Sequence, residues 1–279
     1  MSRPDEDVDC YLSVDGIEFF RQRNGCKFNA MNPTYMLPSD DEESKGDWAV
    51  ELNEEIPWVF VTGVDIVPIQ LREVPVRCRF EIWNIAMPDM PYDDAYFDLI
   101  HARDVLTGIC NYPQFLGQVA RILRPGGLVI LIKPDLVQYA DDKSEDEWML
   151  GSESGPRGWF TLWETYRNCL TLLGVDVTVP QRLRKLLEGT GAFENIEDCR
   201  AMIPVGFYPE DKRVLTVGQL QWMAHDLLLP ALRSMFLSSG MVESRVDQII
   251  KDAQTDLYCG NTFGLSSHLH IVHATRREE

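Results

Sequence analysis

Residues 58–135 alternate short apolar runs with polar turns, and this pattern constrains the fold more than any other feature of the chain. Nearly continuous apolar strands are typical of a parallel sheet that is buried on both faces. Strands that alternate with helices at this spacing predict an α/β fold with a doubly wound, mostly parallel sheet. The predicted strands are 59–65, 78–85, 97–102 and 128–132, with one amphipathic helix over 112–123.

The remaining sequence predicts a helix before these strands and a helix-rich part after them. We expect three domains: an N-terminal polar lead-in over 1–46, a Rossmann-like core over 47–135, and a helical cap over 136–279 whose last strands complete the sheet. The cap begins with a predicted mobile loop over 136–158. The other predicted helices are 47–56, 159–173, 181–187, 217–239 and 242–258, and the other predicted strands are 195–203 and 266–275.

Charge and cysteine usage exclude several classes of partner. The net charge of −18 argues against non-specific binding to nucleic acid or to an anionic membrane, which both need basic surface. No apolar run reaches the roughly 20 residues that span a bilayer, and the N-terminus lacks the features of a targeting peptide. The seven cysteines are dispersed, as is typical of reduced thiols. We therefore expect a soluble protein of the cytoplasm, with the nucleus as the alternative.

Polar residues at the predicted carboxyl ends of the strands are the candidate binding residues, because ligands of open α/β sheets bind there. The carboxylate of Asp65 suits the two hydroxyls of a ribose, although a carboxylate at this position also caps loops. The amide of Asn84 and the backbone of Ile85 suit an adenine edge. His101 is the only histidine at a predicted strand end, which makes it the candidate general base.

Other groups of residues give weaker signals. His268 and His270 share one face of a predicted strand, but no third ligand has a suggestive spacing, so we expect no metal. An aromatic stripe follows helical spacing over 159–170 and fits either the core or the wall of a substrate pocket. No serine-histidine-aspartate signature and no P-loop is present in the sequence.

Several segments together resemble the fungal LaeA-like (TAM-type) methyltransferases, a class I family that uses S-adenosylmethionine. The segments are GVDIVPIQ, CRFEI, FDLIHARD, YPQFLGQVARILRPGGLVIL and MIPVGFYPEDK, and the lead-in GCKFNAMNPTYMLPSDDEE is also similar. The resemblance covers nearly the whole chain. It implies a Rossmann-like class I methyltransferase fold with a helical cap.

The chain departs from the family before its first predicted strand. The family continues from the acidic DEE segment into an apolar strand and a glycine-rich loop, whereas DDEES is followed here directly by KGDWAVEL. Glycines in such a loop let backbone N–H groups approach a cofactor. A second departure is Trp83-Asn84, where the family tends to have paired aspartates. Tryptophan could stack on adenine, but core packing is the commoner role.

The resemblance implies S-adenosylmethionine as cofactor and a small-molecule methyl acceptor in fungal secondary metabolism. Asp65 and Ile66 would hold the ribose, and Asn84 and Ile85 the adenine. Gly46 and Asp47 would supply what remains of the loop at the methionine end. Arg103 would face the cofactor or the acceptor, together with His101.

Two alternatives remain open at this stage. The chain could be a catalytically impaired regulatory module that binds a protein partner, because relatives that influence secondary-metabolite gene expression exist and the glycine-rich loop is missing. It could also lack an in-frame segment through an error in the gene structure at the Ser44–Gly46 join. Binding of the cofactor separates the first alternative from an enzyme.

Overall fold

The computed structural model describes residues 11–14, 17–23, 26–36, 47–66, 74–141, 143–146 and 155–278. The chain divides into two compact units, residues 1–87 (unit 1) and residues 88–279 (unit 2). The functional division expected from the sequence, with boundaries after residues 46 and 135, stays a prediction. None of the described helices is both long enough and apolar enough to cross a bilayer.

The described residues of unit 1 form two small sheets and one helix. Strands β1, β2 and β3 form an antiparallel sheet that the sequence analysis, which treated this segment as a polar lead-in, did not predict. Strands β4 and β5 form a separate parallel pair. The bounds are β1 Tyr11–Val14, β2 Ile17–Arg23, β3 Cys26–Asn29, α1 Asp47–Glu55, β4 Val61–Asp65 and β5 Cys78–Ile82.

Strand β4 has the composition of a central strand but is only half-buried. Each of its residues keeps intermediate exposure, and the preceding Trp58 and Phe60 are 72% and 82% exposed. Within the described residues β4 is paired only with β5. The sequence predicted that β4 is buried on both faces. Within the described part of the chain, the residues that pack on β4 do not bury it to the extent that is typical of such an apolar strand.

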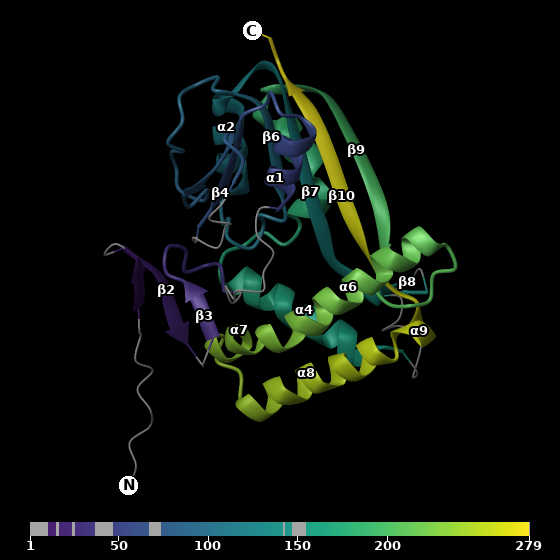
Figure 1. Cartoon of the computed structure of the whole chain (residues 1–279). Coiled ribbons are helices and arrows are strands. Elements are labelled where there is room, and N and C mark those ends of the chain that lie inside the picture. The colour runs from purple at the N-terminus through teal and green to yellow at the C-terminus, as the bar shows by residue number, and fades with distance from the viewer. Residues whose placement is uncertain are drawn as a thin grey trace. The chain divides into compact units, whose positions relative to one another are not determined.

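Unit 2 is built on a mixed sheet in which β6 and β7 run parallel, and β10 lies antiparallel between β7 and β9 (Figure 1). The short β8 pairs with the end of β7. The bounds are β6 Phe97–Arg103, β7 Leu123–Ala140, β8 Lys143–Ser144, β9 Phe193–Pro204 and β10 Leu265–Arg276. The parallel pair is the one that the sequence predicted, and the fold is α/β.

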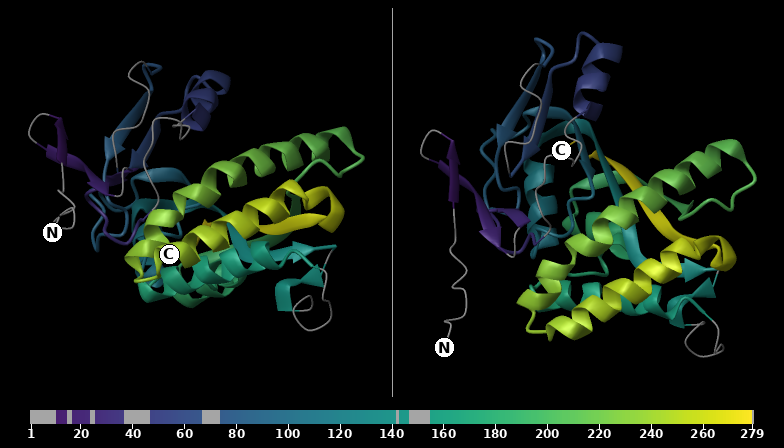
Figure 2. Two further views of the ribbon diagram at one scale, coloured as in Figure 1. Left: turned by 90° about the horizontal axis from the view of Figure 1, so that it is seen from below. Right: turned by 60° about the horizontal axis from the view of Figure 1, so that its bottom comes forward.

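The helices of unit 2 form two groups. Helices α2 and α5 pack against each other and against β7, whereas α4, α6 and α8 lie side by side in a layer (Figures 1 and 2). Asn111 caps α2 by accepting a hydrogen bond from the backbone N–H of Gln114 at 3.0 Å. The bounds are α2 Tyr112–Ile122, α4 Arg157–Leu172, α5 Val179–Thr190, α6 Lys212–Ala231, α7 Arg233–Ser238, α8 Glu243–Tyr258 and α9 Gly260–Phe263.

Two elements differ from the sequence-based expectation. Strand β7 does not stop near residue 132 but continues to Ala140, because β10 pairs with it as far as Leu265 opposite Ala140. The loop predicted from residue 136 therefore starts with strand. The predicted helix over 217–239 is two helices, α6 and α7, which meet at Leu232 just after Pro230. Proline cannot donate the backbone hydrogen bond that a continuous helix needs.

Helices α4 and α8 approach closely at Gly158. A Cβ atom at this position would lie 2.5 Å from the carbonyl carbon of Asp252 and 2.6 Å from its oxygen. The same region ties the start of α4 to α8, since the backbone N–H of Trp159 donates to the carboxylate of Asp256 at 3.0 Å. Close backbone approach therefore holds this corner of the helical layer.

We expect Gly158→Ala to destabilise the protein by about 1–3 kcal/mol, because the added methyl group would have to push α8 away. Gly117→Ala is the matched control, since a Cβ atom on this α2 glycine has no neighbour within 4 Å. Its expected effect is neutral or stabilising by up to about 1 kcal/mol. Urea unfolding of both variants measures the difference, and equal stabilities would contradict the close-approach argument.

Candidate functional site

In unit 1 the predicted site residues lie at the ends of β4 and β5. Asp65 is the last residue of β4 and is half-buried, as is Ile66 after it. The backbone N–H of Trp83 donates to the carbonyl of Asp65 at 2.8 Å, so the two strand ends lie side by side. The indole N–H of Trp83 is buried with no hydrogen-bond partner within the described residues. Asp65 and Trp83 are therefore neighbours along the backbone at this end of the strand pair.

Asn84 is buried, and neighbouring residues already occupy most of the hydrogen-bonding capacity of its side-chain amide. Its oxygen accepts hydrogen bonds from the backbone N–H of Ala86 at 3.0 Å and from Asn32 at 3.4 Å. Its amide nitrogen donates to the carbonyl of Met31 at 3.3 Å. The predicted adenine contact would have to use the remaining N–H, and it stays a prediction, as does that of the half-buried Ile85.

The two residues expected at the methionine end give little further information. Gly46 lies outside the described residues, and Asp47 is the first residue of α1. Their predicted role stays a prediction.

In unit 2 the predicted site residues lie near the end of β6. His101 is half-buried, and burial together with the charge of Arg103 lowers the pKa of its imidazole. The imidazole is therefore neutral at pH 7 and able to accept a proton. Arg103 ends the strand and is exposed. Asp104 follows with a φ of 54°, a conformation that costs energy for most residues and turns this side chain away from the strand direction.

Asp104 lies near Lys133, a buried residue that the sequence did not single out. Asp104 keeps an exposed surface, but desolvation by the surrounding protein raises the pKa of its carboxyl, and the positive charges of Lys133 and Arg103 oppose this shift. Lys133 is fully buried on β7, and its Nζ has no hydrogen-bond partner within the described residues. It lies 5.6 Å from the ring centroid of Tyr112, whose hydroxyl is also buried without a described partner. The signal available in the sequence was a lysine inside the apolar run LVILIKP.

Asp135 follows the predicted strand 128–132 but lies inside the longer β7. It is buried and accepts hydrogen bonds from the backbone N–H of Val137 at 3.1 Å and from Gln181 at 3.1 and 3.2 Å. The Nε2 atom of His270 lies 3.4 Å from its second oxygen. Burial alone would raise the pKa of Asp135, but these hydrogen bonds together lower it. The carboxylate is therefore charged.

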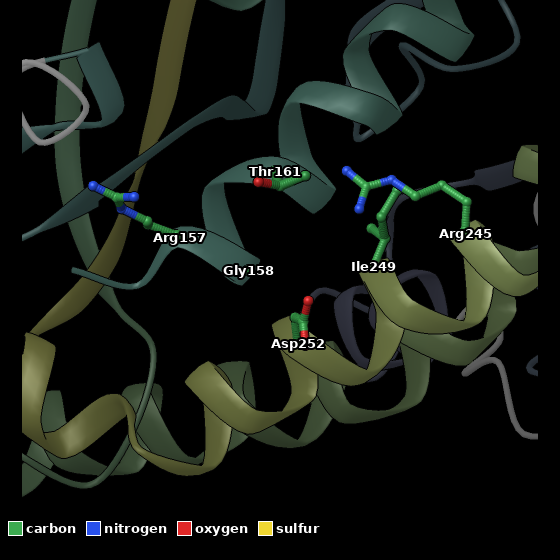
Figure 3. A pocket seen from close by; sticks show the side chains of 6 residues that line it. All are labelled: Arg157, Gly158, Thr161, Arg245, Ile249 and Asp252. Carbon is green, nitrogen blue, oxygen red and sulfur yellow. The ribbon is translucent and has the colours of Figure 1, made fainter. Parts of the chain in front are cut away.

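Two pockets are found in unit 2. The smaller lies between α4 and α8, has a volume of about 110 Å³, and is drawn in Figure 3. There Arg157 points away from Arg245 and Asp252, so the side chains do not converge on one point. The larger has a volume of about 530 Å³ and is lined by Asp135, Tyr139, Gln181, Asp198, Arg200 and His270. Only the larger has the size of a small-molecule site.

A metal centre receives no support from the described residues. They contain no group of three or more histidine, cysteine, aspartate or glutamate side chains arranged to hold an ion. His268 lies edge-on against the ring of Tyr139, with 4.2 Å between the ring centroids, and His270 contacts Asp135. The two histidines thus have separate neighbours.

Lys133 should give the stability of the protein a distinctive pH dependence. Burial lowers the pKa of its ammonium from 10.5 to about 7 in the folded state. Between these values the unfolded chain binds more protons, so this group makes stability rise with pH, by up to about 1.4 kcal/mol per pH unit. Lys133→Met removes the contribution.

From pH 7 to pH 9, the free energy of unfolding of the unmodified protein should therefore rise relative to that of Lys133→Met. Urea unfolding at a series of pH values measures it. The same substitution at the exposed Lys185 is the control and should give a constant difference. Parallel stability curves for Lys133→Met and the unmodified protein would show that Lys133 titrates normally.

Comparison with known proteins identifies relatives over most of the chain. The chain is 27% identical over 219 residues to the secondary metabolism regulator laeA of Coprinopsis cinerea, a match that covers 78% of this chain and 54% of the relative. It is 23% identical over 243 residues to the secondary metabolism regulator LAE1 of Cochliobolus heterostrophus, covering 84% of this chain and 74% of the relative. It is 26% identical over 197 residues to the methyltransferase str2 of Strobilurus tenacellus, covering 71% and 66%. The chain thus spans about half the length of the Coprinopsis protein.

The profile of a protein family described as "Methyltransferase domain" matches residues 44–195, which is more than half of the chain. The match includes the parallel pairs β4–β5 and β6–β7, and with them the strand ends that carry Asp65 and His101. The resemblance to the LaeA-like proteins is confirmed by the laeA and LAE1 relatives. The chain belongs to the methyltransferase-domain family and has its Rossmann-like class I fold.

Proposed function

We propose that this protein transfers a methyl group from S-adenosylmethionine to a small molecule of fungal secondary metabolism. The observation that carries the proposal is the family match over residues 44–195, which includes both parallel strand pairs. Relatives named as a methyltransferase and as regulators of secondary metabolism support the biological setting. The fungal sources of these relatives support a fungal role.

The residues of unit 1 fit the adenosine part of the cofactor. Asp65 presents a carboxylate at the carboxyl end of a parallel strand, where it can accept two charge-assisted hydrogen bonds from ribose hydroxyls. The buried indole N–H of Trp83 lacks a described partner and can donate to an acceptor on the ligand. One N–H of Asn84 remains for the adenine ring. These features support Asp65, Ile66, Asn84 and Ile85 as the binding residues.

Bound S-adenosylmethionine would supply a methyl group that its positively charged sulfur already activates. The main task of the protein is then alignment, which explains why a catalytic triad is not needed. The neutral imidazole of His101 suits the acceptance of a proton from the methyl acceptor. Arg103 would attract an anionic group of either ligand. His101 is proposed as the catalytic residue, and Arg103 as a binding residue.

A regulatory module without catalysis is the second candidate. Two observations favour it: relatives are named as regulators, and the apolar residues Trp58 and Phe60 stay exposed in the described structure. Exposed apolar groups of this size are common where a protein partner binds. Cofactor binding separates the two candidates, because a module that has lost the cofactor site gains nothing from S-adenosylmethionine.

We expect S-adenosylmethionine to raise the melting temperature and to bind saturably at micromolar concentration in calorimetry. A ligand at 100 times its Kd stabilises a protein by about 2.7 kcal/mol. Asp65→Asn should weaken binding about tenfold or more, since it removes the charge from the ribose contacts. Asp93→Asn changes an exposed carboxylate in unit 2 and should bind normally. No thermal shift even at millimolar cofactor would exclude the enzyme and favour the regulatory module.

A further inference from the structure

The larger pocket of unit 2 lies on one face of the β7–β10–β9 sheet. Its six lining residues come from these three strands and from α5, which packs on the same sheet. All of them belong to one compact unit, so the pocket does not depend on how the two units are placed. Its volume of about 530 Å³ is within the usual range for a metabolite or drug-sized ligand.

Basic side chains form a row across this sheet. His270 on β10 lies opposite Lys133 on β7 and also opposite Arg200 on β9. Directly opposite residues of antiparallel strands project from the same face, with Cβ atoms about 5 Å apart. Lys133, His270 and Arg200 therefore stand side by side on the face that carries the pocket. Arg200 adds a positive charge to this face in a chain with a net charge of −18.

Arg200 is available to bind a ligand. It is exposed and lines the pocket, and among the described residues it has neither an ion pair nor a side-chain hydrogen bond. The chain has 44 acidic and 26 basic residues, so an unpaired guanidinium inside a pocket is not explained by a shortage of carboxylates. A guanidinium binds a carboxylate through two parallel hydrogen bonds.

His270 is held in one orientation by a fixed carboxylate. Asp135 is itself anchored by Gln181 and by the backbone N–H of Val137. Because a carboxylate can only accept, the Nε2 atom of His270 carries the hydrogen, and in this tautomer Nδ1 is the ring nitrogen that accepts. Nδ1 can accept a hydrogen bond from a hydroxyl group. Asp198, two residues before Arg200 on β9, adds a second acceptor at the pocket wall.

We propose that this pocket binds a small hydroxylated carboxylate, with the ligand's carboxylate on Arg200 and its hydroxyl group at His270 and Asp198. The guanidinium of Arg200 attracts the anion. His270 and Asp198 both accept hydrogen bonds, so the ligand must also carry a donor. A carboxylate ligand without a hydroxyl group would face the negative charge of Asp198 with no hydrogen bond to offset the repulsion. As a statement about the methyl acceptor the proposal rests on the proposed function, whereas the binding itself does not.

The probe is 4-hydroxybenzoate, tested by ligand-observed NMR and calorimetry on the full chain. Two analogues divide its contacts: benzoate lacks the hydroxyl group and phenol lacks the carboxylate. We expect 4-hydroxybenzoate to bind more tightly than either, by about tenfold for one lost charge-assisted contact. Arg200→Gln should reduce the affinity for 4-hydroxybenzoate about tenfold and bring it close to that of phenol. His270→Gln should remove the preference over benzoate.

Arg184→Gln is the matched control, because Arg184 is exposed on α5 and pairs with Glu188 outside the pocket. It should leave all affinities unchanged. Equal binding of benzoate and 4-hydroxybenzoate, unchanged affinity in Arg200→Gln, or no binding at about 10 mM probe would overturn the proposal. The thermal shift with S-adenosylmethionine, measured on Arg200→Gln, tests the cofactor site separately, so the pocket can fail while the proposed function holds.

Discussion

The pairing of β7 along both of its edges is the constraint on which unit 2 depends. On one edge β6 runs parallel to it, and this places His101 and Asp104 at the carboxyl end of the pair. On the other edge β10 runs antiparallel, and its register sets His270 opposite Lys133. Side chains alternate between the faces of a strand, so a slip of one residue in either register would turn a whole set of side chains to the opposite face. The proposed catalytic residue and the pocket therefore share one structural support.

Local sequence was sufficient for the elements whose signals are local. The apolar run before Asp65, the amphipathic helix from Tyr112, and the alternation over 266–275 correspond to β4, α2 and β10. Asp65, His101 and Arg103 were predicted at strand ends, and all three lie there. Strand ends can be predicted because the apolar pattern and the polar residue that follows it lie within a few positions of each other in the sequence. The chemistry of these residues is a separate matter, and their roles stay predictions.

The features that the sequence did not predict depend on contacts between distant segments. Strand β7 extends to Ala140 because β10, more than 120 residues later, continues to pair with it. The contact between Asp135 and His270 joins residues 135 positions apart, and the row that includes Arg200 requires two registers at once. Neither the composition nor the spacing of residues along the chain predicts which residues of two distant strands lie opposite each other. The sequence consequently linked His270 with His268 and gave no sign that its neighbour in the fold is the carboxylate of Asp135.

The proposed ligand pocket and the proposed cofactor residues lie on strands that differ in how well they are paired and covered. The pocket at Arg200 and His270 belongs to a sheet in which β10 pairs with β7 and with β9 along most of its length, with one register shift in each pairing, and which α5 covers. Asp65 belongs to a strand that has one partner within the described residues and half-exposed apolar side chains. Burying those side chains would be favourable by about 25 cal/mol for each Å² removed from water. Any segment that packs on β4 would therefore hold Asp65 more firmly. Such packing should change the affinity for the cofactor far more than the affinity of the Arg200 pocket for its ligand.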